Sequence, residues 1–240
     1  MEQDNRSLNI LNPSSHLIEA YKKLQVNIQI ASMNQKVKVI QVTSSEAGEG
    51  KTFTVANLAA VYAAKNKKTI VLDLDFRKPK IHQVFNFDIK NGVIDVLAEN
   101  ISLEEAIKHH ESGVDILTRG SKPLNIELTL ESEKLENLVN KLKETYDVIL
   151  LDCPPTMVVT DASLITKLAD GLLFVVAYNH SKKDIVKESI KRIKSTGVNL
   201  LGVVLSQIEK ASERSYYNFG YYYYNYNSYS ETNDNEGGNE

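Results

Sequence analysis

The residues best suited to chemistry lie in the run Ser-Glu-Ala-Gly-Glu-Gly-Lys-Thr at positions 45–52. Gly48 and Gly50 allow the backbone to turn so that its N–H groups point inward, and a helix that begins near Lys51 adds the positive end of its dipole. Lys51 could then place a positive charge on β- and γ-phosphates, and Thr52 could offer a hydroxyl to Mg²⁺. Gly-x-Gly alone would also suit a plain turn before a helix, but Gly-Lys-Thr between a strand and a helix favours a phosphate-binding loop.

The whole loop is therefore a candidate nucleotide-binding segment, although a serine stands where glycine usually opens such a loop. The candidate contacts are Ser45, Glu46, Ala47, Gly48, Glu49, Gly50, Lys51 and Thr52.

Carboxylates follow two apolar runs that read as strands. Asp73 and Asp75 come after residues 70–72, and Asp152 comes after residues 148–151. A single Asp at a strand end is more often a cap or a turn former. Three of them on strands that flank a phosphate loop favour a Mg²⁺ site, because a hard cation prefers oxygen ligands.

These residues require a scaffold that brings several strand ends together. Short apolar runs alternate with helical patterns along the chain, as in a parallel sheet that is covered on both faces. We expect strands at 37–42, 69–74, 114–117, 148–151, 172–177 and 200–205, and helices at 17–31, 52–64, 102–109, 131–146, 161–168 and 181–195. The fold class is α/β, with a doubly wound, mostly parallel sheet whose ligand lies outside the carboxyl ends of the strands.

Composition narrows the function classes. The 240 residues are 42% hydrophobic and 25% charged, which is typical of an ordinary globular domain. With one cysteine there is no internal disulfide, and the five histidines show no zinc-site spacing. With a net charge of −3, the chain is not basic enough to be a general nucleic-acid binder. The sequence shows no apolar run long enough for a membrane span and no N-terminal leader pattern, so we expect a cytoplasmic protein.

The C-terminal part differs in composition from the rest. Residues 216–229 contain eight of the twelve tyrosines, and residues 216–240 carry four acidic side chains but no Lys or Arg. Such a segment has little with which to build a core, so we expect it to be disordered. The predicted organisation is an N-terminal amphipathic helix region at 1–35, a phosphate-loop domain at 36–207 and a flexible tyrosine-rich tail at 208–240.

Taken together, these motifs resemble the bacterial tyrosine kinases that regulate capsule and exopolysaccharide export. The matching stretches are residues 44–52 as Walker A, Val71-Leu-Asp-Leu-Asp-Phe-Arg-Lys-Pro79 as the additional Walker A′ motif, and Ile149-Leu-Leu-Asp-Cys-Pro-Pro155 as Walker B. The terminal tyrosine cluster supports the match. The resemblance implies the phosphate-loop NTPase fold of the septum-site and partition ATPases, ATP and Mg²⁺ as cofactors, and regulation of polysaccharide polymerisation.

The resemblance also implies roles for individual residues. Lys51 and Thr52 bind phosphates and Mg²⁺, Asp75 and Asp152 hold the metal and its waters, and Asp73 orients or deprotonates the attacking tyrosine. Lys51, Asp73, Asp75 and Asp152 are therefore the candidate catalytic residues. Ser206 stands where the family usually places a base-reading asparagine. The implied phosphoacceptors, modified between subunits, are Tyr216, Tyr217, Tyr221, Tyr222, Tyr223, Tyr224, Tyr226 and Tyr229.

Several partners are implied as well. They are a transmembrane polysaccharide co-polymerase adaptor that activates the kinase at the inner face of the cell membrane, further copies of the chain in an oligomer such as a ring, and a cognate phosphotyrosine phosphatase. The implied acceptor or subunit contacts are Glu19, Lys22, Arg77 and Lys78. The family often has arginines at Lys22 and Gln25, so this chain lacks two guanidiniums at the expected contact.

Two other functions remain open. One is a nucleotide-switched ATPase that positions a partner on the membrane, as the septum-site and partition proteins do. Those proteins place a lysine at the second loop position, where this chain has Glu46. The other is a non-catalytic scaffold whose tail is only a substrate, but the intact set of Lys51, Thr52 and three aspartates favours an active enzyme.

Overall fold

The computed structural model describes residues 15–157, 160–178 and 180–208. By its internal contacts the chain divides into two units, Met1–Ser206 and Gln207–Glu240. All the elements below belong to the first unit, and apart from residue 208 the predicted flexible tail lies outside the described residues.

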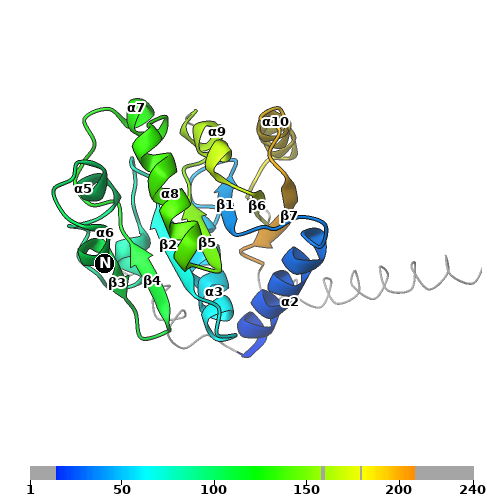
Figure 1. Ribbon diagram of the computed structural model, residues 1–240. Helices are drawn as coiled ribbons and strands as arrows, with labels where there is room; N and C mark the ends of the chain where they lie inside the picture. The colour runs from blue at the N-terminus through cyan, green and yellow to red at the C-terminus, as the bar shows by residue number, and fades with distance from the viewer. Residues whose placement is uncertain (1–14, 158–159, 179, 209–240) are drawn as a thin grey trace, which may run out of the picture. The chain divides into compact units, whose positions relative to one another are not determined.

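A seven-stranded sheet in the order β3-β4-β2-β5-β1-β6-β7 forms the centre of this unit (Figure 1). The neighbouring strands are parallel, except that β3 runs antiparallel to β4. The doubly wound, mostly parallel α/β fold is thus confirmed. The strands are β1 Val39–Ser44, β2 Thr69–Asp73, β3 Lys108–His109, β4 Val114–Leu117, β5 Val148–Asp152, β6 Gly171–Ala177 and β7 Leu200–Ser206.

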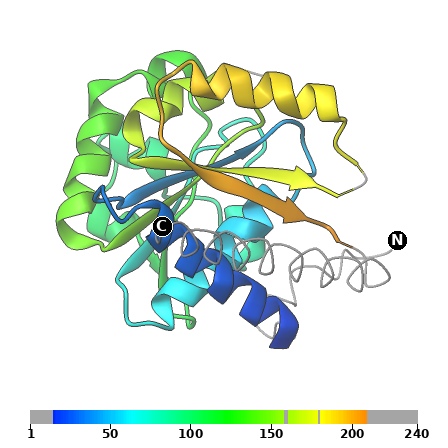
Figure 2. The same cartoon turned by 90° about the vertical axis from the view of Figure 1, so that its right-hand side faces the viewer.

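Helices cover both faces of the sheet. Those on the first face are α2 Ser15–Ala31, α3 Lys51–Ala63 and α4 Ile81–Val84, and those on the second are α5 Val93–Leu97, α6 Leu103–Ala106, α7 Ile126–Leu130, α8 Glu133–Thr145, α9 Asp161–Ile165 and α10 Lys183–Lys194. Figure 2 shows α10 on one side of the strands, with α2 and α3 on the other. The near-continuous apolar strands follow from this arrangement, because β1, β2 and β5 are buried along their whole length.

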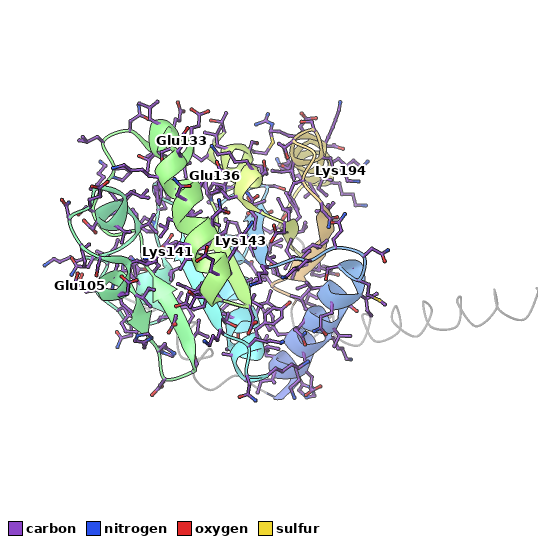
Figure 3. All side chains as sticks on the ribbon, viewed as in Figure 1. Glu105, Glu133, Glu136, Lys141, Lys143 and Lys194 are labelled. Carbon is purple, nitrogen blue, oxygen red and sulfur yellow. The ribbon has the colours of Figure 1, made fainter. Side chains whose placement is uncertain are left out.

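The longer helices form where the apolar spacing and the caps agree. In α8, Leu135, Leu138 and Leu142 are buried, and the Ser132 hydroxyl caps the first turn by accepting a hydrogen bond from the Leu135 N–H. Figure 3 shows the charged face of the same helix, with Glu133, Glu136 and Lys141 along it.

One predicted helix is much shorter than expected. The 102–109 pattern forms a helix only from Leu103 to Ala106, because Ile107 adopts an extended backbone and residues 108–109 pair with β4. His109 consequently lies in a strand, where its Nδ1 is 2.6 Å from Asp115 Oδ1. The short helices α4, α5 and α7 were not predicted. Most other boundaries differ from the predicted ones by at most two residues, which is the usual uncertainty; for example, the first strand is 39–44 instead of 37–42, and Leu74 follows β2. The 161–168 pattern forms an α-helix only as far as Ile165, and the short 3-10 helix η1 Thr166–Leu168 follows it.

The sheet brings the predicted site residues to one edge. Val42 of β1 and Asp73 of β2 both pair in register with Asp152 of β5, so these three strands end side by side. The phosphate loop leaves β1 at this edge and enters α3. Among the described residues, no helix is long and apolar enough to cross a membrane.

Candidate active site

The loop between β1 and α3 has the backbone of a phosphate cradle. Gly48 and Gly50 have φ values of +84° and +89°, a left-handed conformation that favours glycine, and Gly50 is the N-cap residue of α3. The Lys51 side chain folds over the loop, with its Nζ 3.1 Å from Ser44 Oγ and 3.5 Å from the Glu46 carbonyl oxygen. The ammonium therefore lies where phosphate oxygens would approach the loop.

Lys51 is buried, which lowers the pKa of its ammonium. The carboxylates of Asp152, Asp75 and Glu49 act in the opposite direction and favour the charged form. Lys51 is thus a buried cation with carboxylates nearby. A nucleotide that brings Mg²⁺ would offer phosphate oxygens to the ammonium and a cation to the carboxylates, so that each buried charge gains an opposite one.

Thr52 and Asp152 join the loop to the end of β5. The Thr52 hydroxyl donates a hydrogen bond of 2.8 Å to Asp152 Oδ2. Asp152 Oδ1 is buried and has no hydrogen-bond partner among the described residues. Burial raises the pKa of Asp152 to about 7, while Lys51 lowers it. This oxygen is available to a metal ion or to a water bound to one.

Asp73 occupies the same place at the end of β2. Its Oδ2 accepts 3.0 Å hydrogen bonds from the backbone N–H groups of Lys80 and Ile81, which fixes the orientation of the carboxylate. Its Oδ1 is buried and unpartnered within the described residues. Burial and the nearby Asp152 raise the pKa of Asp73 well above its usual value. Asp73 is thus an oriented carboxyl group with one oxygen available to accept a proton.

These residues fit a magnesium ion that is bound largely through the nucleotide and water. No group of three or more His, Cys, Asp or Glu side chains in the described residues is arranged to hold a metal by itself. Mg²⁺ in nucleotide sites usually retains several waters and takes one or two protein ligands. The paired Thr52 and Asp152, together with the half-buried Asp75, meet that requirement.

The Glu49 side chain is held by hydrogen bonds within the protein, and its predicted contact with the nucleotide stays a prediction. Its buried carboxylate accepts a 2.8 Å hydrogen bond from the Glu46 N–H and a short one from the Ser181 hydroxyl, and its backbone carbonyl accepts 2.6 Å from the Ser206 hydroxyl. The segment between β6 and α10 and the end of β7 therefore clamp the loop through Glu49. The role of Ser206 in reading the base stays a prediction, but its hydroxyl hydrogen already has a partner in the loop.

Arg77 and Lys78 have different surroundings. The Arg77 guanidinium binds both oxygens of the buried Asp161 carboxylate, at 2.8 and 3.0 Å, and so joins the segment after β2 to the first residue of α9. This contact lies within the chain, and the predicted contact of Arg77 and Lys78 with an acceptor or a neighbouring subunit stays a prediction. Lys78 is exposed, and its backbone N–H donates a 3.0 Å hydrogen bond to Asp75 Oδ1.

Comparison with known proteins places this site in a family. Residues 37–200 match a family described as AAA domain. The chain is 33% identical to the tyrosine-protein kinase YwqD of Bacillus subtilis over 85% of its length and 88% of that protein. The chain belongs to the bacterial tyrosine-protein kinase family. The putative tyrosine-protein kinase AmsA of Erwinia amylovora is 32% identical over 88% of the chain, which spans only 29% of that longer relative.

Solved structures agree with this membership. The kinase domain of the Escherichia coli tyrosine kinase ETK superposes with a TM-score of 0.80 at 28% identity, covering 85% of this chain and 80% of that domain. The septum-site-determining protein MinD of Pyrococcus horikoshii, complexed with Mg-ADP, gives 0.60 at 27% identity and covers 70% of this chain and 69% of its own. The similarity to the tyrosine kinase is the greater of the two.

The helix that the kinase family is expected to use for subunit contact is α2. Glu19 and Lys22 form an exposed 2.8 Å ion pair on it. Gln25, in contrast, is buried, and its side-chain oxygen accepts a hydrogen bond from the Lys65 ammonium at the end of α3. Position 25 therefore serves the internal α2–α3 contact in this member, and the subunit role of Glu19 and Lys22 stays a prediction.

The structure thus brings together Lys51, Thr52, Asp73, Asp75 and Asp152 and leaves Glu19 and Lys22 on a separate helix, while the eight candidate phosphoacceptor tyrosines lie outside the described residues. We did not predict the supporting residues Ser181 and Asp161, because their partners are more than eighty positions away in the sequence.

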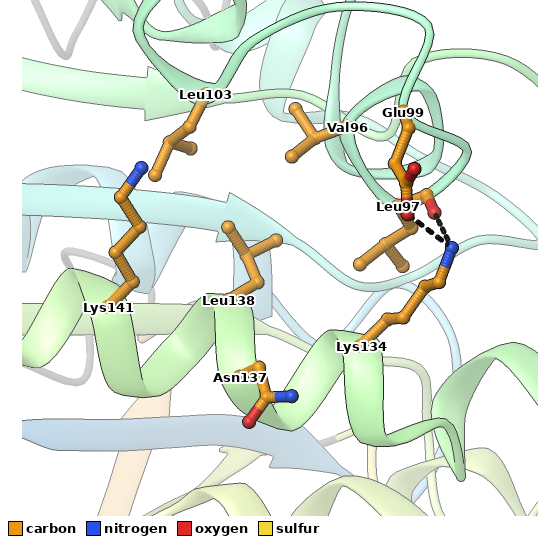
Figure 4. A pocket seen from close by; sticks show the side chains of 8 residues that line it. All are labelled: Val96, Leu97, Glu99, Leu103, Lys134, Asn137, Leu138 and Lys141. Atoms are coloured by element: carbon orange, nitrogen blue, oxygen red, sulfur yellow. Dashed lines mark hydrogen bonds and ion pairs between the residues drawn. The ribbon is translucent and has the colours of Figure 1, made fainter.

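A shallow pocket of about 310 Å³ lies elsewhere, between α8 and the segment of α5 and α6 (Figure 4). Its lysines already form ion pairs, Lys134 with Glu99 and Lys141 with Glu104. Since its lining contains no residue of the site described above, this pocket plays no part in the chemistry that follows.

Proposed function

We propose that this protein is an ATP-dependent protein-tyrosine kinase that phosphorylates its own C-terminal tyrosine cluster between subunits. The observation that carries the proposal is the convergence of Lys51, the Thr52–Asp152 pair and the oriented Asp73 at one sheet edge. Two of the carboxylate oxygens there, Asp73 Oδ1 and Asp152 Oδ1, are buried without a partner in the described part of the chain.

The chain's own residues divide the reaction between them. The loop N–H groups and Lys51 would bind the phosphates, and Thr52 and Asp152 would hold a Mg²⁺ ion, which would supply charge neutralisation when bound with ATP. Asp73 Oδ1 takes the proton of the tyrosine hydroxyl as the phenolic oxygen forms its bond to the γ-phosphorus. The bond from the γ-phosphorus to the bridging oxygen breaks, and ADP leaves with that electron pair. A raised pKa makes Asp73 a better proton acceptor than an exposed aspartate.

The acceptors in this proposal are the tail tyrosines 216–229 of a neighbouring copy, and the product regulates capsule or exopolysaccharide polymerisation and export. A transmembrane adaptor would hold the kinase at the membrane and stimulate it, and a phosphotyrosine phosphatase would reverse the modification. These points rest on the family membership and on the tail composition. Adding a cytosolic segment of such an adaptor to the purified chain should raise the rate of phosphotyrosine formation.

The test uses purified full-length protein with Mg-ATP, followed by phosphotyrosine mapping. Wild type should gain phosphate on tail tyrosines, whereas Lys51→Met and Asp73→Asn should gain none and keep their fold by circular dichroism. Asp73→Asn should still bind ADP, because Asp73 acts on the acceptor. Asp75→Asn and Asp152→Asn should require more Mg²⁺, since each removes a negative charge beside the cation. Equal phosphotyrosine in wild type and Asp73→Asn would overturn the assignment.

A membrane-positioning ATPase is the alternative that shares this fold. The likeness to MinD favours it, but Glu46 stands where those ATPases carry a lysine. Mg-ATP hydrolysis without any phosphotyrosine in the wild-type protein would support the alternative.

A further inference from the structure

Helix α10 and the residue that caps it concentrate positive charge. Residues 182–194 contain six basic and two acidic side chains, in a chain whose net charge is −3. The four lysines of the helix follow one another at spacings of four, four and three residues, so they lie along one side of it. We call these four the lysine stripe; all are exposed, and they are Lys183, Lys187, Lys191 and Lys194.

The charge of the lysine stripe is not neutralised within the fold. None of its four ammonium groups forms an ion pair with another of the described residues. Helix α8 covers the same face of the sheet, and each of its lysines has a carboxylate partner: Lys134 pairs with Glu99, Lys141 with Glu104 and Lys143 with Asp170. The stripe therefore presents positive charge to its surroundings, whereas α8 presents ion pairs.

The lysine stripe points away from the middle of the sheet. On the other flank of α10, Arg192 donates a 3.1 Å hydrogen bond to the carbonyl oxygen of Thr156, in the segment after the central strand β5. The buried side of α10 packs on β6 and β7, as Figure 2 shows. Since Arg192 reaches toward β5, the stripe lies toward the sheet edge formed by β7. The helical repeat places Asp184 and Glu188 between the two flanks, on the side away from the sheet.

Two exposed apolar side chains lie at the same edge. Val203 and Leu205 of β7 are 52% and 38% exposed. They pair in register with Phe174 and Val176 of β6, whose side chains pack beneath α10. Because residues in register on neighbouring strands point to the same side of a sheet, Val203 and Leu205 lie on the α10 face. The edge beside the lysine stripe thus combines positive charge with exposed apolar surface.

We propose that the lysine stripe, together with Val203 and Leu205, binds the anionic lipid headgroups of a membrane directly. Lysines in a row beside small apolar groups suit such a surface, because the ammonium groups contact headgroup phosphates while the apolar groups enter the interface. A nucleic acid fits less well, since its bases stack on aromatic side chains and the exposed groups here are aliphatic. This contact goes beyond the proposed function: it needs neither the transmembrane adaptor nor phosphate transfer.

The experiment sediments the purified full-length protein with phosphatidylcholine vesicles that contain or lack phosphatidylglycerol. Wild type should bind the anionic vesicles and not the neutral ones, and added salt should weaken the binding. Replacing Lys187 and Lys191 together by glutamine should lower the partition coefficient roughly tenfold or more. Val203→Thr keeps the shape of the side chain and should lower it roughly threefold. Circular dichroism should show that these variants keep the wild-type fold.

The matched control replaces Lys134 and Lys141 of α8 by glutamine. It removes the same charge from lysines that already have carboxylate partners, so vesicle binding should stay within about twofold of wild type. Equal losses in the two double variants would show an effect of net charge alone and would overturn the proposal. So would equal binding of wild type to neutral and anionic vesicles, or no binding to either.

Two further arms separate lipid headgroups from other anions. Inorganic phosphate should displace the protein from the vesicles no more than chloride does at the same ionic strength, and stronger displacement would indicate a phosphate site instead of a lipid surface. Wild type that binds polyglutamate but not anionic vesicles would replace the membrane by an acidic protein partner. Phosphotyrosine formation without vesicles should be equal in wild type and all these variants, so failure of the lipid contact leaves the kinase assignment standing.

Discussion

Asp73 and Asp152 are an in-register pair on neighbouring strands, and both carboxyl groups are buried. Two negative charges so placed repel each other unless a cation or a proton lies between them. Lys51 supplies part of that compensation, and a nucleotide-bound Mg²⁺ would supply the rest. The free enzyme should therefore hold a proton that the loaded enzyme releases.

The pH dependence of stability should show this proton. Burial raises the pKa of Asp152 to about 7 in the folded protein, while an unfolded aspartate titrates near about 4. Between these values the folded state binds more protons than the unfolded state, so the free energy of unfolding falls as the pH rises. In EDTA and without nucleotide, we expect the Tm of wild type to fall between about pH 5 and 8.

Asp152→Asn provides the control, since it cannot titrate in that range. Its Tm should depend less on pH than that of wild type, as measured by calorimetry in the same buffers. Parallel curves for the two proteins would contradict the raised pKa of Asp152.

Glu49 should affect nucleotide binding without touching the nucleotide. Glu49→Gln keeps the shape of the side chain but places an amide donor or a weaker acceptor against the Glu46 N–H. Leaving a buried N–H poorly paired costs about 1–3 kcal/mol, so we expect roughly a tenfold loss of ADP affinity by calorimetry. Glu136→Gln on the exposed face of α8 removes the same charge and should bind ADP normally. Equal affinities in both variants would show that the Glu49 clamp does not position the loop.

At the residue scale, the sequence predicted the groups that a local motif defines. Lys51 and Thr52 were recognisable from their neighbours, and the aspartates from the apolar strands before them. The Glu49–Ser181 and Arg77–Asp161 contacts were not, because each depends on how distant strands are ordered in the sheet. A single sequence does not reveal such pairings.

At the scale of elements, the segment from Gly92 to Asp95 anchors α5 against the chain that follows β4. A β-carbon on Gly92 would lie 2.1 Å from the Thr118 carbonyl oxygen and 2.4 Å from the Gly120 nitrogen. Backbone atoms cannot move away as a flexible side chain can. We expect Gly92→Ala to reduce the free energy of unfolding by about 1–3 kcal/mol in a urea titration.

Gly202 in β7 offers a matched control. Among the described residues, no heavy atom beyond Gly202 and its two chain neighbours lies within 4 Å of the position that its β-carbon would take, so Gly202→Ala should change stability by less than about 0.5 kcal/mol. If the two variants unfold at the same urea concentration, α5 is not held by this close approach.

Element length explains why α4, α5 and α7 were not predicted. The 13-residue helices α3 and α8 and the 12-residue α10 are long enough to show a helical repeat, whereas α4, α5 and α7 have four or five residues and do not. In the 102–109 segment, the apolar Ile107 continues the helical pattern, but pairing of residues 108–109 with β4 overrides it. Strand pairing is a tertiary interaction that local periodicity does not contain.

At the scale of the whole molecule, we predict that the tail links catalysis to assembly. An unmodified segment 216–240 that occupies a neighbour's site would help to hold subunits together. Deleting it should remove most autophosphorylation but preserve ATP binding, which involves the loop and strand ends only. Phosphotyrosine blotting and ADP calorimetry on the same deletion variant check the two expectations, and a loss of ADP binding would contradict them.

Phosphorylation should then release the tail and loosen the oligomer. Each phosphate adds about −1.5 to −2 charges at neutral pH, so eight would add roughly −12 to −16 to a segment that already has four acidic residues and no bases. The modified segment would also enter a site filled with nucleotide phosphates, where like charges repel.

Light scattering before and after Mg-ATP treatment should therefore show a fall in mass for wild type. Replacing the eight tyrosines with phenylalanine should keep the larger mass throughout, because the rings still pack but accept no phosphate. A wild-type oligomer whose mass is unchanged although its tail is heavily phosphorylated would eliminate the switch without affecting the kinase assignment.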